Sequence, residues 1–330
     1  MTSPQDHPAR FQRQRLRING IHWDFIDEGQ GPLALLLHGF PYLSYAFRYL
    51  IPGLISAGWR VVAPDLPGYG RSDCPEDVHR HTQIALTEDL STLIHECGVN
   101  SAVLIGHDVG ATLSYTTALV HPEVVSGLVL LNTPPQPRST TPPREIWKTI
   151  REKTGSRFYQ EYFTSEQAIV ELNRDIRQTL LSTMYSISGS AIAAHRWRSL
   201  IGPSEGFLQT VHEPRQPPKW LSTTALGHYV SEYGRHGFGG ALMPYRSREH
   251  SWKISAHLQG CHPPHAALFI GGALDPALER LEPALKALDK TLPQLRGREM
   301  LPGAGHNLPE EMPHETLKLM LPFMEMLVAQ

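Results

Sequence analysis

Three cysteines in 330 residues are too few and too scattered for a disulfide framework. Cys74, Cys97 and Cys261 instead predict a protein of a reducing compartment. The sequence also lacks any apolar run near the ~18 residues that a membrane-spanning helix needs, and residues 1–15 lack the apolar stretch of a signal peptide. We therefore expect a cytoplasmic protein without a membrane partner.

Neither sign of charge dominates the sequence. The 30 Lys and Arg residues nearly balance the 32 Asp and Glu residues, so the formal net charge is -2 at pH 7. Such a chain has no field to attract nucleic acid. The 18 histidines are numerous, but the pairs His79/His81 and His262/His265 lack the companion carboxylates or cysteines of a metal site. We predict no metal and no cofactor.

The length predicts a core with an inserted lid, because 330 residues exceed the ~250–300 at which one core stops growing. Strand-like and helix-like segments alternate to about Thr133, and Pro134 and Pro135 then break the pattern. Helix-like segments follow until the alternation resumes at Ala266. We predict an α/β protein with a mostly parallel sheet flanked by helices. Residues 1–133 and 256–330 form the core, the first part including N-terminal strands, and residues 134–255 form a mainly helical cap.

The segment from Gly106 to Gly110 reads Gly-His-Asp-Val-Gly and follows a strand-like run at residues 102–105. This pattern is typical of a nucleophile elbow, a sharp strand-to-helix turn in which small residues flank the reactive side chain. Asp108 takes the place where serine is usual. A carboxylate is already ionised at neutral pH and can attack a saturated carbon that bears a leaving group. The alternative for Asp108 alone is a simple helix cap.

Other parts of the chain supply partners for such a nucleophile. Residues 33–37 form an apolar strand that leads into a turn, so the backbone N–H groups of Phe40 and Val109 are candidates for an oxyanion hole. Asp275 follows another strand-like run and would orient the base. His306, between Gly305 and Asn307 in a loop before the last helix, would be that base. The chain order nucleophile, acid, histidine is that of the α/β-hydrolase arrangement.

Several motifs resemble the soluble type of epoxide hydrolase in the α/β-hydrolase superfamily, and the resemblance covers nearly the whole chain. They are His-Gly-Phe-Pro at 38–41, Asp-Leu-Pro-Gly-Tyr-Gly-Arg-Ser at 65–72, Gly-His-Asp at 106–108 and Leu-Asn-Thr-Pro at 131–134. The resemblance implies two cap tyrosines that donate to the epoxide oxygen, here Tyr159 and Tyr245, with Tyr162 as the alternative to the first. A protonated phenol suits that role because ring opening creates an alkoxide. We further expect His38, Pro41, His107 and Asn307 to bind substrate.

The chain departs from the family pattern at two positions. Val109 and Asn307 stand where the family commonly has an aromatic residue, usually Trp after the nucleophile. We therefore expect a wider pocket and a bulky organic epoxide.

The same positions argue against related activities. Haloalkane dehalogenases typically have the motif His-Gly-Asn-Pro or a halide-binding Trp after the nucleophile. This chain has Phe40 and Val109 at those positions. A dehalogenase-like hydrolase and a non-catalytic ligand-binding protein of the same fold remain alternatives.

The expected product is a vicinal diol, formed through an ester on Asp108 that water hydrolyses, although a substrate hydroxyl replacing water would give a cyclic ether. The sequence leaves open whether the protein is a monomer or a homodimer.

Overall fold

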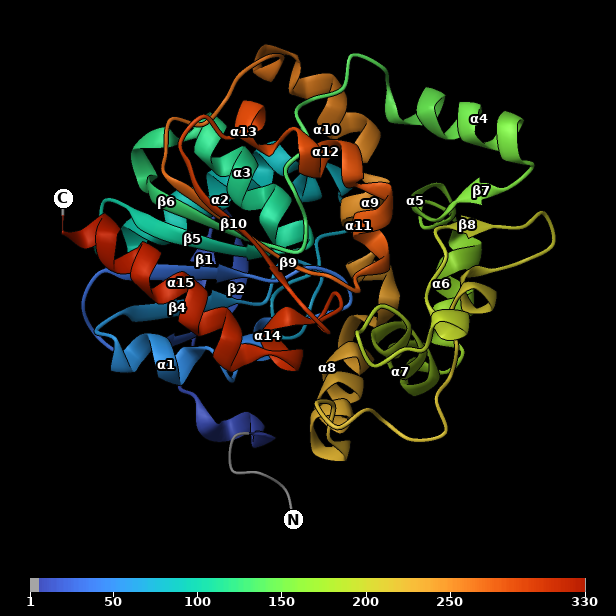
Figure 1. The fold of residues 1–330 in the computed structure, drawn as a ribbon, viewed down its shortest axis with the longest axis horizontal. Helices are drawn as coiled ribbons and strands as arrows, with labels where there is room; N and C mark the ends of the chain where they lie inside the picture. Colours follow the sequence, from blue (N-terminus) through green and yellow to red (C-terminus); the bar gives the residue numbers. More distant parts are fainter. Residues whose placement is uncertain (1–5, 330) are drawn as a thin grey trace.

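An eight-stranded sheet runs through the centre of the computed structural model, which describes residues 6–329 (Figure 1). The strand order is β1-β2-β4-β3-β5-β6-β9-β10. The first two strands are antiparallel to their neighbours, and the other six are parallel to one another. The strands are β1 (Arg13–Ile18), β2 (Ile21–Glu28), β3 (Leu33–Leu37), β4 (Arg60–Pro64), β5 (Ala102–His107), β6 (Val125–Leu131), β9 (Ala267–Gly272) and β10 (Leu295–Leu301).

The central strands are apolar on both sides because helices cover both faces of the sheet. Along β3, Leu35 and Leu37 pack into one buried cluster, whereas Ala34 and Leu36 pack into the other, as the alternation of side chains along a strand requires. In Figure 1, α2 (Gln83–Glu96) and α3 (Val109–Val120) cover one face, and α1 (Ile51–Ser56) and α15 (Pro313–Val328) cover the other. The predicted α/β architecture with a mostly parallel sheet is confirmed.

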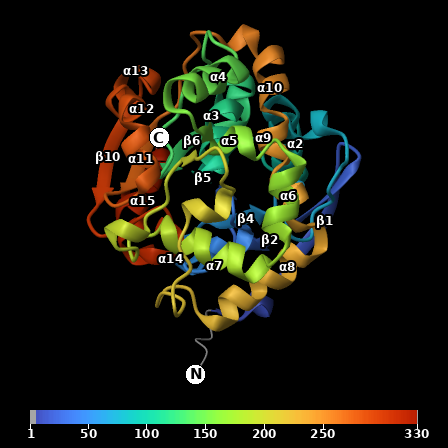
Figure 2. The ribbon, with the colours of Figure 1, turned by 90° about the vertical axis from the view of Figure 1, so that its right-hand side faces the viewer.

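A mainly helical segment lies between the end of β6 at Leu131 and the start of β9 at Ala267. It covers one side of the core (Figure 2). Its only strands among the described residues are the short antiparallel pair β7 (Arg157–Phe158) and β8 (Leu200–Ile201). Its helices are α4 (Pro143–Thr154), α5 (Tyr159–Tyr162), α6 (Glu166–Asn173), α7 (Ile176–Ser186), α8 (Thr223–Ala241), α9 (Met243–Arg246) and α10 (Arg248–Ile254).

Buried polar contacts hold this segment on the core. Tyr229 on α8 donates to Glu310 Oε2 at 3.2 Å, and Glu310 also pairs with the fully buried guanidinium of Arg48. Tyr69 of the core donates to the Ala241 carbonyl at 2.9 Å. A buried polar group that loses its hydrogen-bond partner costs about 1–3 kcal/mol, so the Tyr229 and Tyr69 contacts favour this position of the segment.

Short helices complete the second part of the core after β9. They are α11 (Pro276–Arg280), α12 (Glu282–Lys286), α13 (Leu288–Thr291) and α14 (Leu308–Glu311). Across residues 6–329, no helix combines the length and the apolar character needed to cross a membrane.

Candidate active site

Asp108 occupies the turn between β5 and α3. Its φ of 55° and ψ of -118° are rare for a residue other than glycine, which is the strained geometry of a nucleophile elbow. The elbow packs tightly against the neighbouring strand, since a Cβ added to Gly110 would lie 1.9 Å from the Leu37 carbonyl oxygen. Alanine therefore cannot replace this glycine without moving the backbone.

The Asp108 carboxylate lies among hydrogen-bond donors. The Phe40 N–H donates to its Oδ1 at 2.9 Å, and the Val109 N–H also bonds it. Burial would raise the pKa of Asp108, but His306, His107 and the Val109 amide outweigh burial and lower it. Asp108 is thus ionised at neutral pH, and both amides predicted for the oxyanion hole face it.

His306 lies between two carboxylates. Its Nδ1 is 2.8 Å from Asp275 Oδ2, and its Nε2 is 3.4 Å from Asp108 Oδ2. Burial would lower the pKa of His306, but Asp275 and Asp108 outweigh it and raise the pKa to about 10. The imidazole is therefore protonated at neutral pH while both carboxylates are charged. The structure brings together the three residues that the sequence placed in the order nucleophile, acid and histidine.

Asn132 is a site residue to which the sequence reasoning gave no role. It directly follows β6 with a φ of 62°, and its fully buried Nδ2 donates to Asp275 Oδ2 and to the Gly305 carbonyl, both at 3.0 Å. Its amide thus links the orienting acid to the histidine loop. The Leu-Asn-Thr-Pro motif marked the position but not this contact.

Glu311 supports the same loop and has no local sequence signal. Its carboxylate accepts the N–H groups of Gly305 at 3.1 Å and Asn307 at 2.9 Å, on either side of His306. It also accepts the N–H of Gly189, from the inserted helical segment, at 2.7 Å. Burial raises the pKa of Glu311 to about 7 despite these three donors.

Two tyrosines from the inserted segment face the nucleophile across a cavity of about 340 Å³. Tyr159 and Tyr245 line this cavity together with Asp108 and His306, and their rings lie 6.1 Å apart. Burial raises the pKa of both phenols, so each keeps its proton at neutral pH. Tyr162, the alternative to Tyr159, donates instead to Glu171 at 2.6 Å and does not line the cavity.

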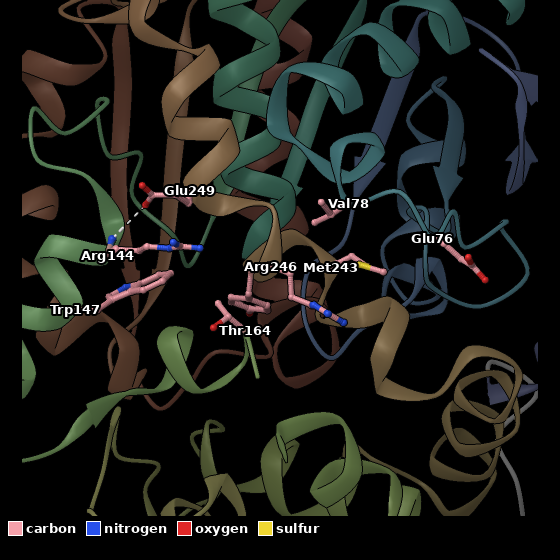
Figure 3. A pocket seen from close by; sticks show the side chains of 9 residues that line it. Glu76, Val78, Arg144, Trp147, Thr164, Met243, Arg246 and Glu249 are labelled. Atoms are coloured by element: carbon pink, nitrogen blue, oxygen red, sulfur yellow. Dashed lines mark hydrogen bonds between the residues drawn. The ribbon is translucent and has the colours of Figure 1, made fainter. Parts of the chain in front are cut away.

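A second pocket of about 310 Å³ adjoins the first, and Trp147 and Tyr245 line both. Figure 3 shows its other side chains, among which Glu249 accepts the Arg144 backbone N–H at 3.3 Å. Tyr245 therefore lies in the wall between the catalytic cavity and this more polar space.

Four residues that we expected to bind substrate do not line the catalytic cavity. His38, Pro41, His107 and Asn307 are all buried. Leu66 N–H donates to His38 Nε2 at 3.0 Å, and Asn307 donates to the Met184 carbonyl at 2.8 Å.

His107 also bonds to the backbone. Burial lowers its pKa to about 4, so the ring is neutral, and its Nε2 donates to the His306 carbonyl at 2.6 Å. These polar side chains support loops, because their hydrogen bonds go to backbone groups. Of the two departures that suggested a wide pocket, Val109 lines the cavity and Asn307 does not.

Comparisons with known proteins agree with this geometry. Residues 32–184 match the model of the alpha/beta hydrolase fold family. The chain is 34% identical to Epoxide hydrolase A of Mycobacterium tuberculosis, with 93% of this chain and 95% of that protein covered.

Two solved structures are similar over almost their whole length. An epoxide hydrolase from an endophytic Streptomyces has a TM-score of 0.93 at 30% identity, covering 98% of this chain and 97% of that one. Epoxide Hydrolase A from Mycobacterium thermoresistibile has a TM-score of 0.88 at 34% identity, with coverages of 96% and 98%. The chain therefore belongs to the epoxide hydrolase family of the α/β-hydrolase superfamily.

Proposed function

We propose that this protein opens an epoxide to a vicinal diol through a covalent ester on Asp108. The observation that carries the proposal is an ionised carboxylate facing two protonated phenols across one cavity. An epoxide needs both groups, because one carbon accepts the nucleophile while the ring oxygen accepts a proton or hydrogen bond.

In the first step, an Asp108 carboxylate oxygen attacks a ring carbon and the bond from that carbon to the ring oxygen breaks. Tyr159 and Tyr245 donate to the oxygen as its negative charge develops. No group among residues 6–329 accepts a hydrogen bond from the Tyr245 hydroxyl, so this phenol is free to donate to substrate. The Tyr159 oxygen accepts from Gln160 Nε2 at 3.1 Å, which leaves its own proton available.

In the second step, water attacks the ester carbonyl and the Asp108 carboxylate is regenerated as the diol leaves. Ester formation removes the charge of Asp108, which is one of the charges that keep the His306 pKa near 10. The pKa of the imidazole then falls, so His306 becomes a base only after the ester has formed. The Phe40 and Val109 amides would hold the oxyanion.

We further propose that residues 134–255 act as the cap, since this stretch supplies both phenols to a nucleophile on the core. The product is a diol where water reaches the ester, and a bulky substrate remains our prediction from Val109. Three free cysteines support action in the cytoplasm. A monomer or a homodimer is compatible with a site built from one chain.

The test is the intact mass of the His306→Ala protein after exposure to epoxides and, separately, to haloalkanes. We expect a gain of one whole epoxide mass, because Asp108 can still form the ester but the ester cannot be hydrolysed. Asp108→Ala is the control and should gain nothing. Adducts formed only from haloalkanes, with halide released, would instead identify a dehalogenase. Absence of any adduct while the protein stays folded would favour a ligand-binding role.

A further inference from the structure

The wall of the catalytic cavity carries an excess of positive charge. Arg138, Arg248 and Arg280 line it, whereas Asp108 is its only carboxylate. The Asp108 charge already has a partner in protonated His306. None of the three arginines forms an ion pair with any residue within the described range 6–329. The cavity therefore offers cations that no residue of the described part of the chain pairs with.

Arg138 is occupied by backbone and amide groups. Its guanidinium donates to the Trp252 carbonyl at 3.0 Å and to Gln259 Oε1 at 2.8 Å. It also lies 4.4 Å from the centre of the Trp252 ring. These contacts make Arg138 a brace between two segments, which leaves Arg248 and Arg280 as the lining cations without a hydrogen-bond or ion-pair partner among residues 6–329.

Arg280 ends α11 on the core and is held in place by an aromatic ring. Its guanidinium carbon lies 3.7 Å from the centre of the Phe158 ring, and Phe158 in turn packs edge-on against Tyr159 at 4.6 Å. Such stacking leaves the N–H groups at the rim of the guanidinium free to bind an anion. No hydrogen bond within residues 6–329 uses them. The Arg280 cation thus sits beside a catalytic phenol with its donors unused.

Arg248 begins α10 in the inserted segment and lines the same cavity, and both arginines are exposed. Its charge acts on Tyr159, on Tyr245 and on Arg280, whose pKa is lowered first by burial and then by Arg248. The adjacent carboxylate does not neutralise it, because Glu249 lines the second pocket and bonds the Arg144 backbone (Figure 3). Two like charges therefore line one cavity together with Asp108 and Tyr159.

We propose that the substrate is an epoxide bearing an anionic group, a carboxylate or a phosphate, which binds between Arg248 and Arg280. An anion there would relieve the repulsion between the two cations and bind two planar donor groups. It would also join α10 of the inserted segment to α11 of the core, so that binding holds both phenols over the nucleophile. This inference rests on the proposed epoxide chemistry.

The experiment compares straight-chain acids that carry a terminal epoxide with their primary amides, over a series of chain lengths. The amide has the same shape without the charge, so the ratio of kcat/KM values isolates the anion. Terminal-epoxide phosphate monoesters form a third arm that distinguishes the two anions. We expect the acid or the phosphate to be preferred, with the preference falling as ionic strength rises.

Arg248→Gln and Arg280→Gln should each lower the ratio of anion to amide about three- to tenfold, chiefly through KM, because each removes one charged donor. The amide should react at nearly the wild-type rate. Lysine at either position keeps the charge and should retain part of the preference, which separates loss of charge from loss of packing. Arg298→Gln is the matched control, an exposed arginine on β10 that lines neither pocket.

Two results would overturn the inference in different ways. In one case, neutral epoxides turn over, but the ratio of kcat/KM values for acid and amide is unchanged in the variant that carries both Arg248→Gln and Arg280→Gln. The anion site is then wrong and the epoxide chemistry stands. If neither charged nor neutral epoxides turn over or form an ester on Asp108, the proposed function fails and the anion site fails with it.

Discussion

Asn132→Gly removes one side-chain amide from the site, and glycine can still adopt the backbone conformation of this position. Asn132 has a φ of 62°, which glycine adopts without strain. The side chain donates to Asp275 and to the Gly305 carbonyl. Its loss therefore frees the orienting acid and the histidine loop while the Phe40 and Val109 contacts to Asp108 remain.

The expected effect falls on the step that needs His306 as a base. A hydrogen bond to a charged group is worth about 1.5–3 kcal/mol, and every ~1.4 kcal/mol is a factor of ten in rate. We expect ester hydrolysis to slow about 10- to 100-fold in Asn132→Gly. Ester formation should change little, because Asp108 attacks without help from a base.

Single-turnover kinetics measures the two steps separately, with the mass of the ester recorded over time. The ester should accumulate in Asn132→Gly. In the wild type it should decay much faster. Asn19→Gly is the matched control, since Asn19 also has a positive φ of 45° and donates to a buried carboxylate, Asp89, at 2.9 Å. Equal slowing of both steps, or unchanged hydrolysis, would refute the role given to Asn132.

Two further predictions concern the phenols and the pH profile. Tyr245→Phe should slow ester formation about 10- to 100-fold, because one donor to the developing alkoxide is lost; Tyr162→Phe, which removes a hydroxyl bonded to Glu171 outside the cavity, should leave that rate unchanged in rapid-quench measurements. The pH profiles of the two steps should differ: ester formation should be flat above about pH 5, since the pKa of Asp108 is below its usual value of ~3.9. Hydrolysis should fall as pH drops through the pKa of His306 in the ester, because the imidazole must be neutral there; that pKa lies below about 10, since the Asp108 charge is lost while Asp275 stays. Identical profiles for both steps, measured in the same single-turnover series, would contradict this order of charges.

Local patterns were sufficient to predict which three residues meet in the candidate site, Asp108, Asp275 and His306. Asp108 could be identified because an elbow imposes glycines at fixed places, and Gly110 indeed touches Leu37 so closely that no Cβ fits. Strand 33–37 was predicted by its apolar run, which reflects burial on both faces. The tyrosines were a different case, because no physical rule singles out Tyr159 among 11 tyrosines. Tyr159 and Tyr245 were predicted from the resemblance to the epoxide hydrolases.

The orientation of neighbouring polar residues could not be predicted from the sequence. His38, His107 and Asn307 stand beside motif residues, but adjacency in the chain does not say which way a side chain points. The structure turns each of them toward backbone groups that would otherwise be buried without partners. Arg248 and Arg280 follow Tyr245 and Asp275 by only a few residues, but no local pattern says that their side chains line the same cavity.

The loop that carries His306 shows why the supporting residues are hidden from sequence. The Ile187 carbonyl accepts the His306 N–H at 2.8 Å, and the Met184 carbonyl accepts the Asn307 side chain. Glu311 then joins Gly189 of that same segment to the amides beside His306. The contacts of Met184, Ile187 and Gly189 join the inserted segment to a core loop more than a hundred positions later in the chain. The segment that carries Tyr159 and Tyr245 therefore also holds the His306 loop, so one packing arrangement sets the positions of these tyrosines and of His306.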